Sequence, residues 1–132
     1  MENNTEIILE TRTDLVDFLK SSQYEYAILK FYADWCAPCK HIGPKVHSLV
    51  EQTAQKFSNE ENKFIFIEVN VDECFDLYAF LKSKKMVRGI PTMFLYSKKV
   101  YENVEDNHKF IPQASVSGTK ENEIQMFFNH IQ

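Results

Sequence analysis

The chain has 132 residues, of which 44% are hydrophobic and 14% aromatic, and its formal net charge is −4. This length predicts one domain spanning residues 1–132, with enough apolar side chains for a core that needs no disulfide staples. The acidic balance and the lack of a basic stripe argue against a nucleic acid as the main partner. Three cysteines are also too few, and odd in number, for the disulfide framework of a small secreted domain.

The N-terminal segment Met1–Asp14 has neither a basic leader nor a long apolar stretch. We therefore expect no signal peptide, transit peptide or membrane span, and the simplest location is a reducing cytosol, with a virion or a host-cell compartment as alternatives. Within this segment, Thr5–Glu10 is an apolar run with the length of a strand. Apolar side chains then recur at helical spacing, which predicts a helix over Arg12–Ser22, capped by Thr13.

Two nearly continuous apolar runs, Tyr26–Ala33 and Lys63–Asp72, predict strands that are covered on both faces. Between them, Cys36–Phe57 has apolar residues at three- and four-residue steps, which predicts a long helix. Pro44 lies inside this helix and is expected to kink it, because proline lacks the backbone N–H that the helix needs there.

The second half of the chain repeats the alternation of helix and strand. A helix is predicted over Cys74–Lys85, with Phe75 on its inward face, and a strand over Pro91–Ser97. The last third is expected to add two strands and a closing amphipathic helix, at Lys99–Val104, Lys109–Ser117 and Lys120–Gln132. This order of elements predicts an α/β fold, with a mixed sheet covered by helices on both faces.

The segment Trp35–Lys40 reads WCAPCK and carries the chemistry. Cys36 and Cys39 face the same side of a helix's first turn, so their sulfurs can form and open a disulfide without large movement. At the helix N-terminus, unpaired N–H groups and the helix dipole favour a thiolate at Cys36, which is the attacking species. Cys39 lies one turn deeper, and we expect it to be better shielded and to act as the resolving thiol. Pro38 stiffens the turn between them.

Two other interpretations of the cysteine pair remain open at this point. The pair could be half of a zinc site, which needs two further ligands at suitable spacing. No second pair exists among the candidates, which are Cys74, His41, His47, His108 and His130. The pair could also be exposed and unreactive.

Three stretches together resemble the thioredoxin family: FYADWCAPCK at Phe31–Lys40, the Gly-Pro pair inside the following helix, and RGIPT at Arg88–Thr92. Ala37 stands where the usual family motif has glycine. The resemblance covers almost the whole chain. It implies an α/β thioredoxin fold, with a central mixed sheet of about five strands flanked by four helices, and a protein-disulfide oxidoreductase that needs no cofactor and no metal.

The same resemblance implies roles for individual residues. Cys36 corresponds to the attacking cysteine and Cys39 to the resolving one. Pro91 corresponds to a cis-proline that packs against the disulfide, and an ordinary trans proline at the start of a strand is the alternative. Ile90 is expected to offer backbone hydrogen bonds to a bound polypeptide. The remaining residues of the expected substrate-binding surface are Trp35, Ala37 and Pro38, with core packing as the alternative role of Trp35.

Lys30 lies in the middle of an otherwise apolar run, six residues before Cys36. The family commonly has a buried aspartate at this position and a lysine on the neighbouring strand, where this chain has Glu68. The exchange of both charges predicts a partly buried ion pair beneath Cys39, in which loss of one partner costs about 3–5 kcal/mol. Glu68 is then the expected proton acceptor, and Lys30 is expected to favour the thiolate. The alternative is that both side chains reach solvent and take no part in the chemistry.

Two further residues bear on the resemblance. Cys74 follows the second buried strand, and some eukaryotic thioredoxins have an extra cysteine at a similar place, so a regulatory or dimer-forming thiol is an alternative to a structural cysteine. Gly118 lies one position after the place of the family's glycine, where Ser117 stands. We therefore expect the docking of a substrate on that side to differ.

The function that these residues favour is a monomeric protein-disulfide reductase, which maintains thiol redox state by dithiol–disulfide exchange through Cys36 and Cys39. Its expected partners are disulfide-containing proteins, with an NADPH-dependent thioredoxin reductase as electron donor and with no nucleic acid or membrane. One alternative is a thiol oxidase or isomerase, although isomerases of this fold usually carry histidine where Pro38 stands. The other alternative is a non-catalytic module that binds a partner.

Overall fold

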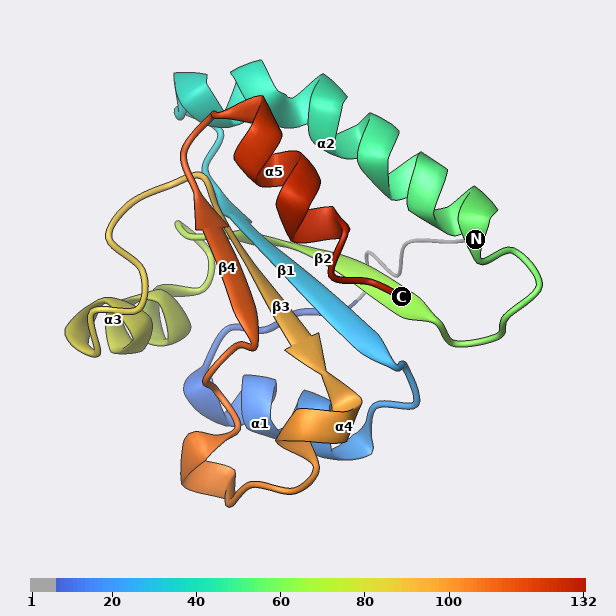
Figure 1. Ribbon diagram of the computed structural model, residues 1–132. Helices are drawn as coiled ribbons and strands as arrows, with labels where there is room; N and C mark the ends of the chain where they lie inside the picture. The colour runs from blue at the N-terminus through green and yellow to red at the C-terminus, as the bar shows by residue number, and fades with distance from the viewer. Residues whose placement is uncertain (1–6) are drawn as a thin grey trace.

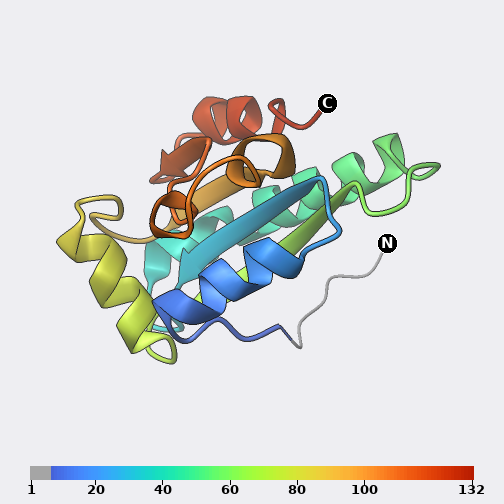
Figure 2. The same ribbon diagram turned by 90° about the horizontal axis from the view of Figure 1, so that it is seen from below.

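The structure is a computed structural model that describes residues 7–132. Figures 1 and 2 show a central sheet with helices on both sides. Its helices and strands are, in chain order, α1 (Arg12–Ser21), β1 (Tyr26–Tyr32), α2 (Ala37–Lys56), β2 (Phe64–Asn70), α3 (Phe75–Ser83), β3 (Thr92–Ser97), α4 (Lys98–Tyr101), β4 (Ala114–Ser117) and α5 (Glu121–Phe128). A short 3-10 helix, Asp106–His108, lies between α4 and β4.

The four strands form one mixed sheet in the order β2-β1-β3-β4 (Figure 1). β1 runs parallel to β2 and antiparallel to β3, and β4 is antiparallel to β3. Every residue of β1 from Ala27 to Phe31 is buried, as expected for a central strand that is covered on both faces. The predicted α/β architecture with a mixed sheet is therefore confirmed.

Two apolar clusters pack against opposite faces of the sheet. On one face, α1 and α3 contribute Leu15 and Leu77 to a cluster that includes Phe31. On the other face, α2 and α5 contribute Val46 and Phe127. Because successive side chains of a strand point to opposite faces, β1 supplies both clusters in alternation.

The described residues contain four strands rather than about five, and five α-helices rather than four. The expected strand at Thr5–Glu10 begins outside the described residues, and its remainder, residues 7–10, forms no strand. The expected strand at Lys99–Val104 is wrong, because the chain forms the single helical turn α4 directly after β3. Buried Lys109 stabilises this turn, since its Nζ donates a hydrogen bond to the Tyr101 carbonyl at 2.9 Å.

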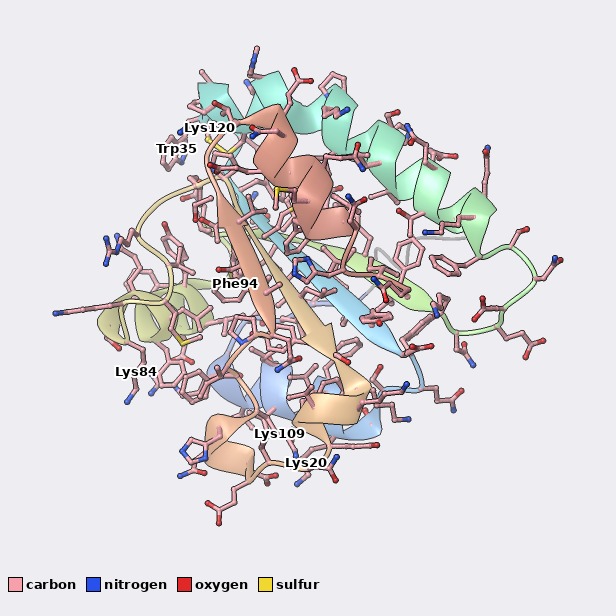
Figure 3. The ribbon with its side chains drawn as sticks, in the orientation of Figure 1. Lys20, Trp35, Lys84, Phe94, Lys109 and Lys120 are labelled. Atoms are coloured by element: carbon pink, nitrogen blue, oxygen red, sulfur yellow. A yellow bond between two sulfur atoms is a disulfide. The ribbon has the colours of Figure 1, made fainter. Side chains whose placement is uncertain are left out.

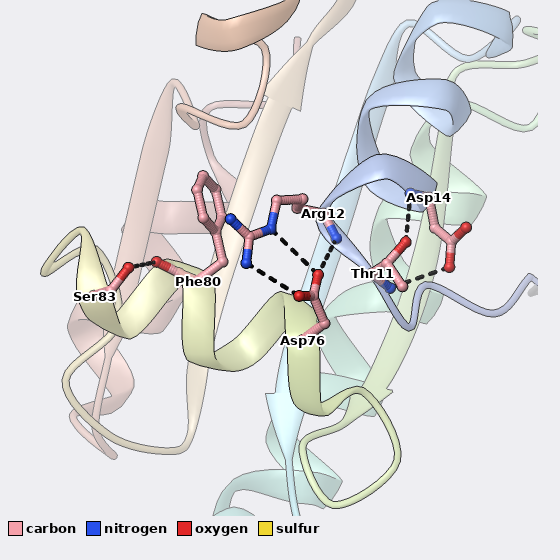
Figure 4. Close-up of polar contacts among 6 residues, drawn as sticks. All are labelled: Thr11, Arg12, Asp14, Asp76, Phe80 and Ser83. Carbon is pink, nitrogen blue, oxygen red and sulfur yellow. Dashed lines mark hydrogen bonds and ion pairs between the residues drawn. The ribbon is translucent and has the colours of Figure 1, made fainter.

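Helix α1 is capped by Thr11 and not, as expected, by Thr13. The Thr11 Oγ1 accepts a hydrogen bond from the Asp14 N–H at 3.0 Å, and the Asp14 carboxylate accepts one from the Thr11 N–H at 3.1 Å (Figure 4). Such a reciprocal pair is a capping box. The carboxylate three residues after Thr11 therefore decides which threonine begins the helix.

The start of α3 is fixed by α1 (Figure 4). The Asp76 carboxylate accepts hydrogen bonds from the backbone N–H of Arg12 at 2.9 Å, from its Nε at 3.3 Å and from its Nη2 at 3.0 Å. In this orientation Leu77 and Leu81 are buried, whereas Phe75 is 81% exposed. The expectation that Phe75 faces inward is therefore wrong.

Helix α2 has 20 residues and positions the cysteine pair. Pro44 lies inside it, and the helix continues beyond this proline to Lys56.

Within residues 7–132, no helix combines the length and the apolar character needed to cross a membrane.

Candidate functional site

A disulfide joins Cys36 and Cys39 at the start of α2, with the two Cα atoms 5.3 Å apart. Cys36 is the N-cap residue, and its Sγ accepts a hydrogen bond from the Cys39 N–H at 3.2 Å. Pro38 lies in the first turn of the helix, where its missing N–H would have no partner in any case. When the disulfide is reduced, the N–H groups and the dipole of this turn stabilise a thiolate at Cys36.

Both cysteines are largely buried, with 3% of Cys36 and 4% of Cys39 exposed. The expectation that Cys39 is better shielded is therefore wrong, because burial does not distinguish the two residues. They differ in position, since Cys36 precedes the helix and Cys39 lies inside its first turn. Ala37 and Pro38 between them are exposed and form part of the rim around the disulfide.

Trp35 lies beside the disulfide at the N-terminal end of α2 (Figure 3). It is 68% exposed, which excludes the alternative that it is a core residue. Its indole N–H donates a hydrogen bond to the Asp72 carboxylate at 2.9 Å. The backbone N–H of Asp72 in turn donates to the side-chain oxygen of Asn70 at 3.0 Å. An exposed aromatic ring held at its polar atom presents a fixed apolar surface at the rim of the site.

Asp72 is not among the site residues that the sequence predicts, yet it orients Trp35. A topological signal for it exists in the sequence. Trp35 follows β1 and Asp72 follows β2, and these two strands are parallel neighbours. The carboxyl ends of neighbouring parallel strands meet at the same edge of a sheet, so residues that directly follow them lie close together.

The loop before β3 passes next to the disulfide. The Ile90–Pro91 peptide bond is cis, as the resemblance implies, and the Ile90 carbonyl oxygen lies 3.9 Å from the Cys36 Sγ. Thr92, the first residue of β3, donates a hydrogen bond from its Oγ1 to the Gly89 carbonyl at 2.7 Å. The hydrogen bond closes the loop on itself and holds Ile90 and Pro91 at the disulfide.

Gly118 directly follows β4. This strand covers only part of the range expected for it, Lys109–Ser117. Its N–H donates a hydrogen bond to the Pro91 carbonyl at 3.0 Å, and its φ of 90° is one that side chains disfavour. Ser117 pairs with Thr92 in the β3–β4 register, and their hydroxyl oxygens are 2.8 Å apart. The expectation that Ser117 stands at the place of the family's glycine stays a prediction.

Lys30 and Glu68 are partners in the parallel β1–β2 register, and the Lys30 Nζ lies 3.8 Å from the Glu68 Oε2. The side chain of Lys30 is 8% exposed, and that of Glu68 is 51% exposed. The predicted ion pair is therefore present, but only its lysine is buried. The alternative that both side chains reach solvent is wrong for Lys30.

A small cavity of about 60 Å³ adjoins this ion pair, and α2 lines it with Gly43, Val46, His47 and Val50. Neither Cys36 nor Cys39 is part of its lining. The cavity beside the ion pair therefore lies beneath the turns of α2 that follow Cys39, and the expectation that the pair lies beneath Cys39 stays a prediction.

Cys74 is a free cysteine that is only 3% exposed. Burial raises the pKa of its thiol to about 11, and the nearby carboxylates of Glu73, Asp72 and Glu10 act in the same direction. A buried thiol that stays protonated at neutral pH is a poor nucleophile. The structure thus favours a structural role for Cys74 over a regulatory or dimer-forming one. Among residues 7–132, no group of three or more histidine, cysteine, aspartate or glutamate side chains is placed to hold a metal ion.

Comparison with known proteins gives a consistent result. A family model described as Thioredoxin matches residues 6–122. A thioredoxin from Pongo abelii is 36% identical over 91 residues, which are 69% of this chain and 74% of that protein. The thioredoxin of Homo sapiens is 36% identical over 90 residues, covering 68% of this chain and 74% of the human protein.

Solved structures show the same fold at lower sequence identity. The structure of Plasmodium falciparum thioredoxin aligns with a TM-score of 0.60 and 21% identity, over 95% of this chain and 98% of the other. That of Malassezia sympodialis thioredoxin aligns with a TM-score of 0.62 and 18% identity, over 94% of this chain and 90% of the other.

Proposed function

The chain belongs to the thioredoxin family of disulfide oxidoreductases, and we propose that within this family it acts as a protein-disulfide reductase. The observation that carries the proposal is the disulfide at the N-cap of α2. It lies between an exposed Trp35 and the Ile90 carbonyl, so a polypeptide can reach it from the rim.

The proposed reaction consists of two exchanges. The thiolate of Cys36 attacks a disulfide of the substrate, a mixed disulfide forms, and one substrate thiolate leaves and takes a proton. Cys39 then loses its proton and attacks the sulfur of Cys36. The second substrate thiolate leaves, the Cys36–Cys39 disulfide closes, and the substrate has gained two electrons. The Cys39 N–H, which points at the Cys36 Sγ, stabilises the sulfur that must be negative in the first step.

The proposed substrate is an extended polypeptide. The backbone of Ile90 would hydrogen-bond to it as an added strand, and Pro91, Trp35, Ala37 and Pro38 would form the contact surface around the disulfide. Glu68 is the proposed acceptor of the Cys39 proton, by way of solvent, because its carboxylate is half-exposed.

A reductase is proposed over an oxidase or isomerase because Pro38 stands where isomerases of this fold usually carry histidine. The electron donor would be an NADPH-dependent thioredoxin reductase, which returns two electrons to the disulfide. We place the protein in the cytosol, where such a donor keeps thiols reduced.

Insulin reduction tests the proposal directly. With dithiothreitol as electron source, the wild-type protein should accelerate the precipitation of the insulin B chain. Cys36→Ser should show only the rate of dithiothreitol alone, and Cys74→Ser should match wild type. If wild type and Cys36→Ser are equally slow, the protein is a partner-binding module and not a reductase.

A further inference from the structure

Lys30 is a buried cation with an incomplete counter-charge. Its side chain is 8% exposed, whereas the carboxylate of Glu68 is 51% exposed and 3.8 Å away, beyond hydrogen-bond distance. Water screens the exposed carboxylate more strongly than the buried ammonium group. The interior beneath α2 therefore experiences a net positive charge from this pair.

The cavity beside this charge is lined by the turns of α2 that directly follow the cysteine pair. Gly43 lines the cavity next to Lys30 and stands four residues after Cys39 on the same face of α2. Four residues of helix rise by about 6 Å, so Gly43, which lines the cavity with Lys30, lies roughly one turn from Cys39. The other titratable group at this cavity is His47, which is exposed and pairs with Glu51 at 3.7 Å on the same helix.

Reduction of the disulfide creates negative charge at this place. Two glutathione molecules supply two electrons and become glutathione disulfide, while the Cys36–Cys39 bond breaks. One of the two protons released by glutathione goes to Cys39, and Cys36 remains a thiolate with the other proton in solvent. A nearby cation stabilises the thiolate of the reduced form, but it has no such charge to stabilise in the disulfide form.

We propose that Lys30 raises the reduction potential of the Cys36–Cys39 couple and that Glu68 opposes this effect. The two residues would set how easily this protein is reduced, and how strongly it reduces others, without touching a substrate. The inference rests on the dithiol–disulfide exchange of the proposed function, but not on its direction.

The sign of each effect distinguishes this electrostatic role from a structural one. If the pair only supported the fold, removal of either partner would loosen the same region and shift the potential in the same direction. If Lys30 acts through its charge, removal of the lysine and removal of the carboxylate shift the potential in opposite directions.

The experiment is a redox equilibrium with glutathione buffers at pH 7, in which alkylation and mass spectrometry give the reduced fraction of intact protein. In Lys30→Met, the equilibrium constant for reduction should fall about tenfold, which corresponds to a potential about 30 mV lower. Lys30→Arg keeps the charge and should stay close to wild type. Glu68→Gln, at a half-exposed position, should raise the constant about threefold, because it removes the opposing charge.

An unchanged or raised constant in Lys30→Met would overturn the inference, as would a lowered constant in Glu68→Gln. If Lys30→Met does not fold, the direction of the shift in Glu68→Gln decides alone. Wild-type protein whose cysteines never equilibrate with glutathione would instead contradict the proposed function, so the two failures are distinguishable.

Discussion

Two lysines at the central sheet are equally buried but differ in how many counter-charges surround them. Lys30 on β1 and Lys63 just before β2 each have 8% of the side chain exposed. The Nζ of Lys63 lies 3.2 Å from Glu25 and 3.4 Å from Glu60, and 4.5 Å from the centre of the Phe57 ring. Among residues 7–132, the Nζ of Lys30 is paired with Glu68 alone, at 3.8 Å.

The difference shows which buried charge supports the fold and which is available for chemistry. A buried charge that is surrounded by counter-charges acts as a structural anchor, because its field is cancelled locally. A buried charge with a half-exposed partner keeps much of its field, which then acts on neighbouring groups. Lys63 is of the first kind. Lys30 is of the second kind, and the cavity beside it is lined by the turns of α2 that follow the cysteine pair.

The largest stability effect should come from Lys63→Met. This change removes a hydrogen bond to Glu25 together with the ion pair to Glu60, so we expect the free energy of unfolding to fall by about 2 kcal/mol. Urea denaturation at pH 7 measures the loss. A difference below about 0.5 kcal/mol would contradict the anchoring role, because surface substitutions typically fall in that range.

The pH dependence of the difference in unfolding free energy between wild type and Lys63→Met is an internal control. Burial alone lowers the pKa of Lys63, but the hydrogen bond and charge of Glu25, with those of Glu60, outweigh it and raise the pKa above 10.5. A raised pKa contributes stability below the unfolded-state pKa, and this contribution disappears as the pH rises through the folded-state value. The difference between wild type and Lys63→Met should therefore be constant from pH 7 to about 9 and shrink above about 10.5.

The sequence predicts the fold wherever local pattern and tertiary structure agree. The apolar run of β1 and the helical spacing of α2 are visible directly, and so is the cysteine pair at the start of α2. The expected strand at Lys99–Val104 is wrong because the chain turns there, and Lys109, eight residues after Tyr101, turns inward and donates a hydrogen bond to the Tyr101 carbonyl. Local spacing contains no information about such a contact.

The candidate site shows the same limit. Pairing of Lys30 with Glu68 follows from the exchange of two charges between matching positions of neighbouring strands. Which of the two is buried does not follow, because both long side chains can reach solvent from a strand and only the packing of α2 over Lys30 decides. Likewise, the hydrogen bond from Trp35 to Asp72 depends on how the ends of β1 and β2 meet.

A smaller effect is expected from Glu68→Gln, which leaves Lys30 buried without its carboxylate. Because Glu68 is half-exposed, we expect a loss of about 1 kcal/mol in the free energy of unfolding. If Glu68 accepts the Cys39 proton, the profile of disulfide-reduction rate against pH should also shift. Glu123→Gln is the matched control, since Glu123 is similarly exposed and pairs with exposed Lys120 at 4.0 Å. An unchanged profile in Glu68→Gln would remove Glu68 from the mechanism.

The smallest stability effect should come from Lys30→Met, although this lysine is as buried as Lys63. The substitution leaves Glu68 half in water, so no buried charge is stranded, and an apolar side chain replaces a poorly compensated cation. We expect the free energy of unfolding of the oxidised protein to change by less than about 1 kcal/mol, and not by the 3–5 kcal/mol typical of a pair with both members buried. Urea denaturation measures this change, with the slope of the free energy against urea concentration expected to stay the same.

A loss of 3 kcal/mol or more would show that Lys30 is compensated as fully as Lys63, and the contrast between the two lysines would then disappear. A small change, together with the expected shift in reduction potential, would mean that the charge of Lys30 acts on the cysteines rather than on the fold.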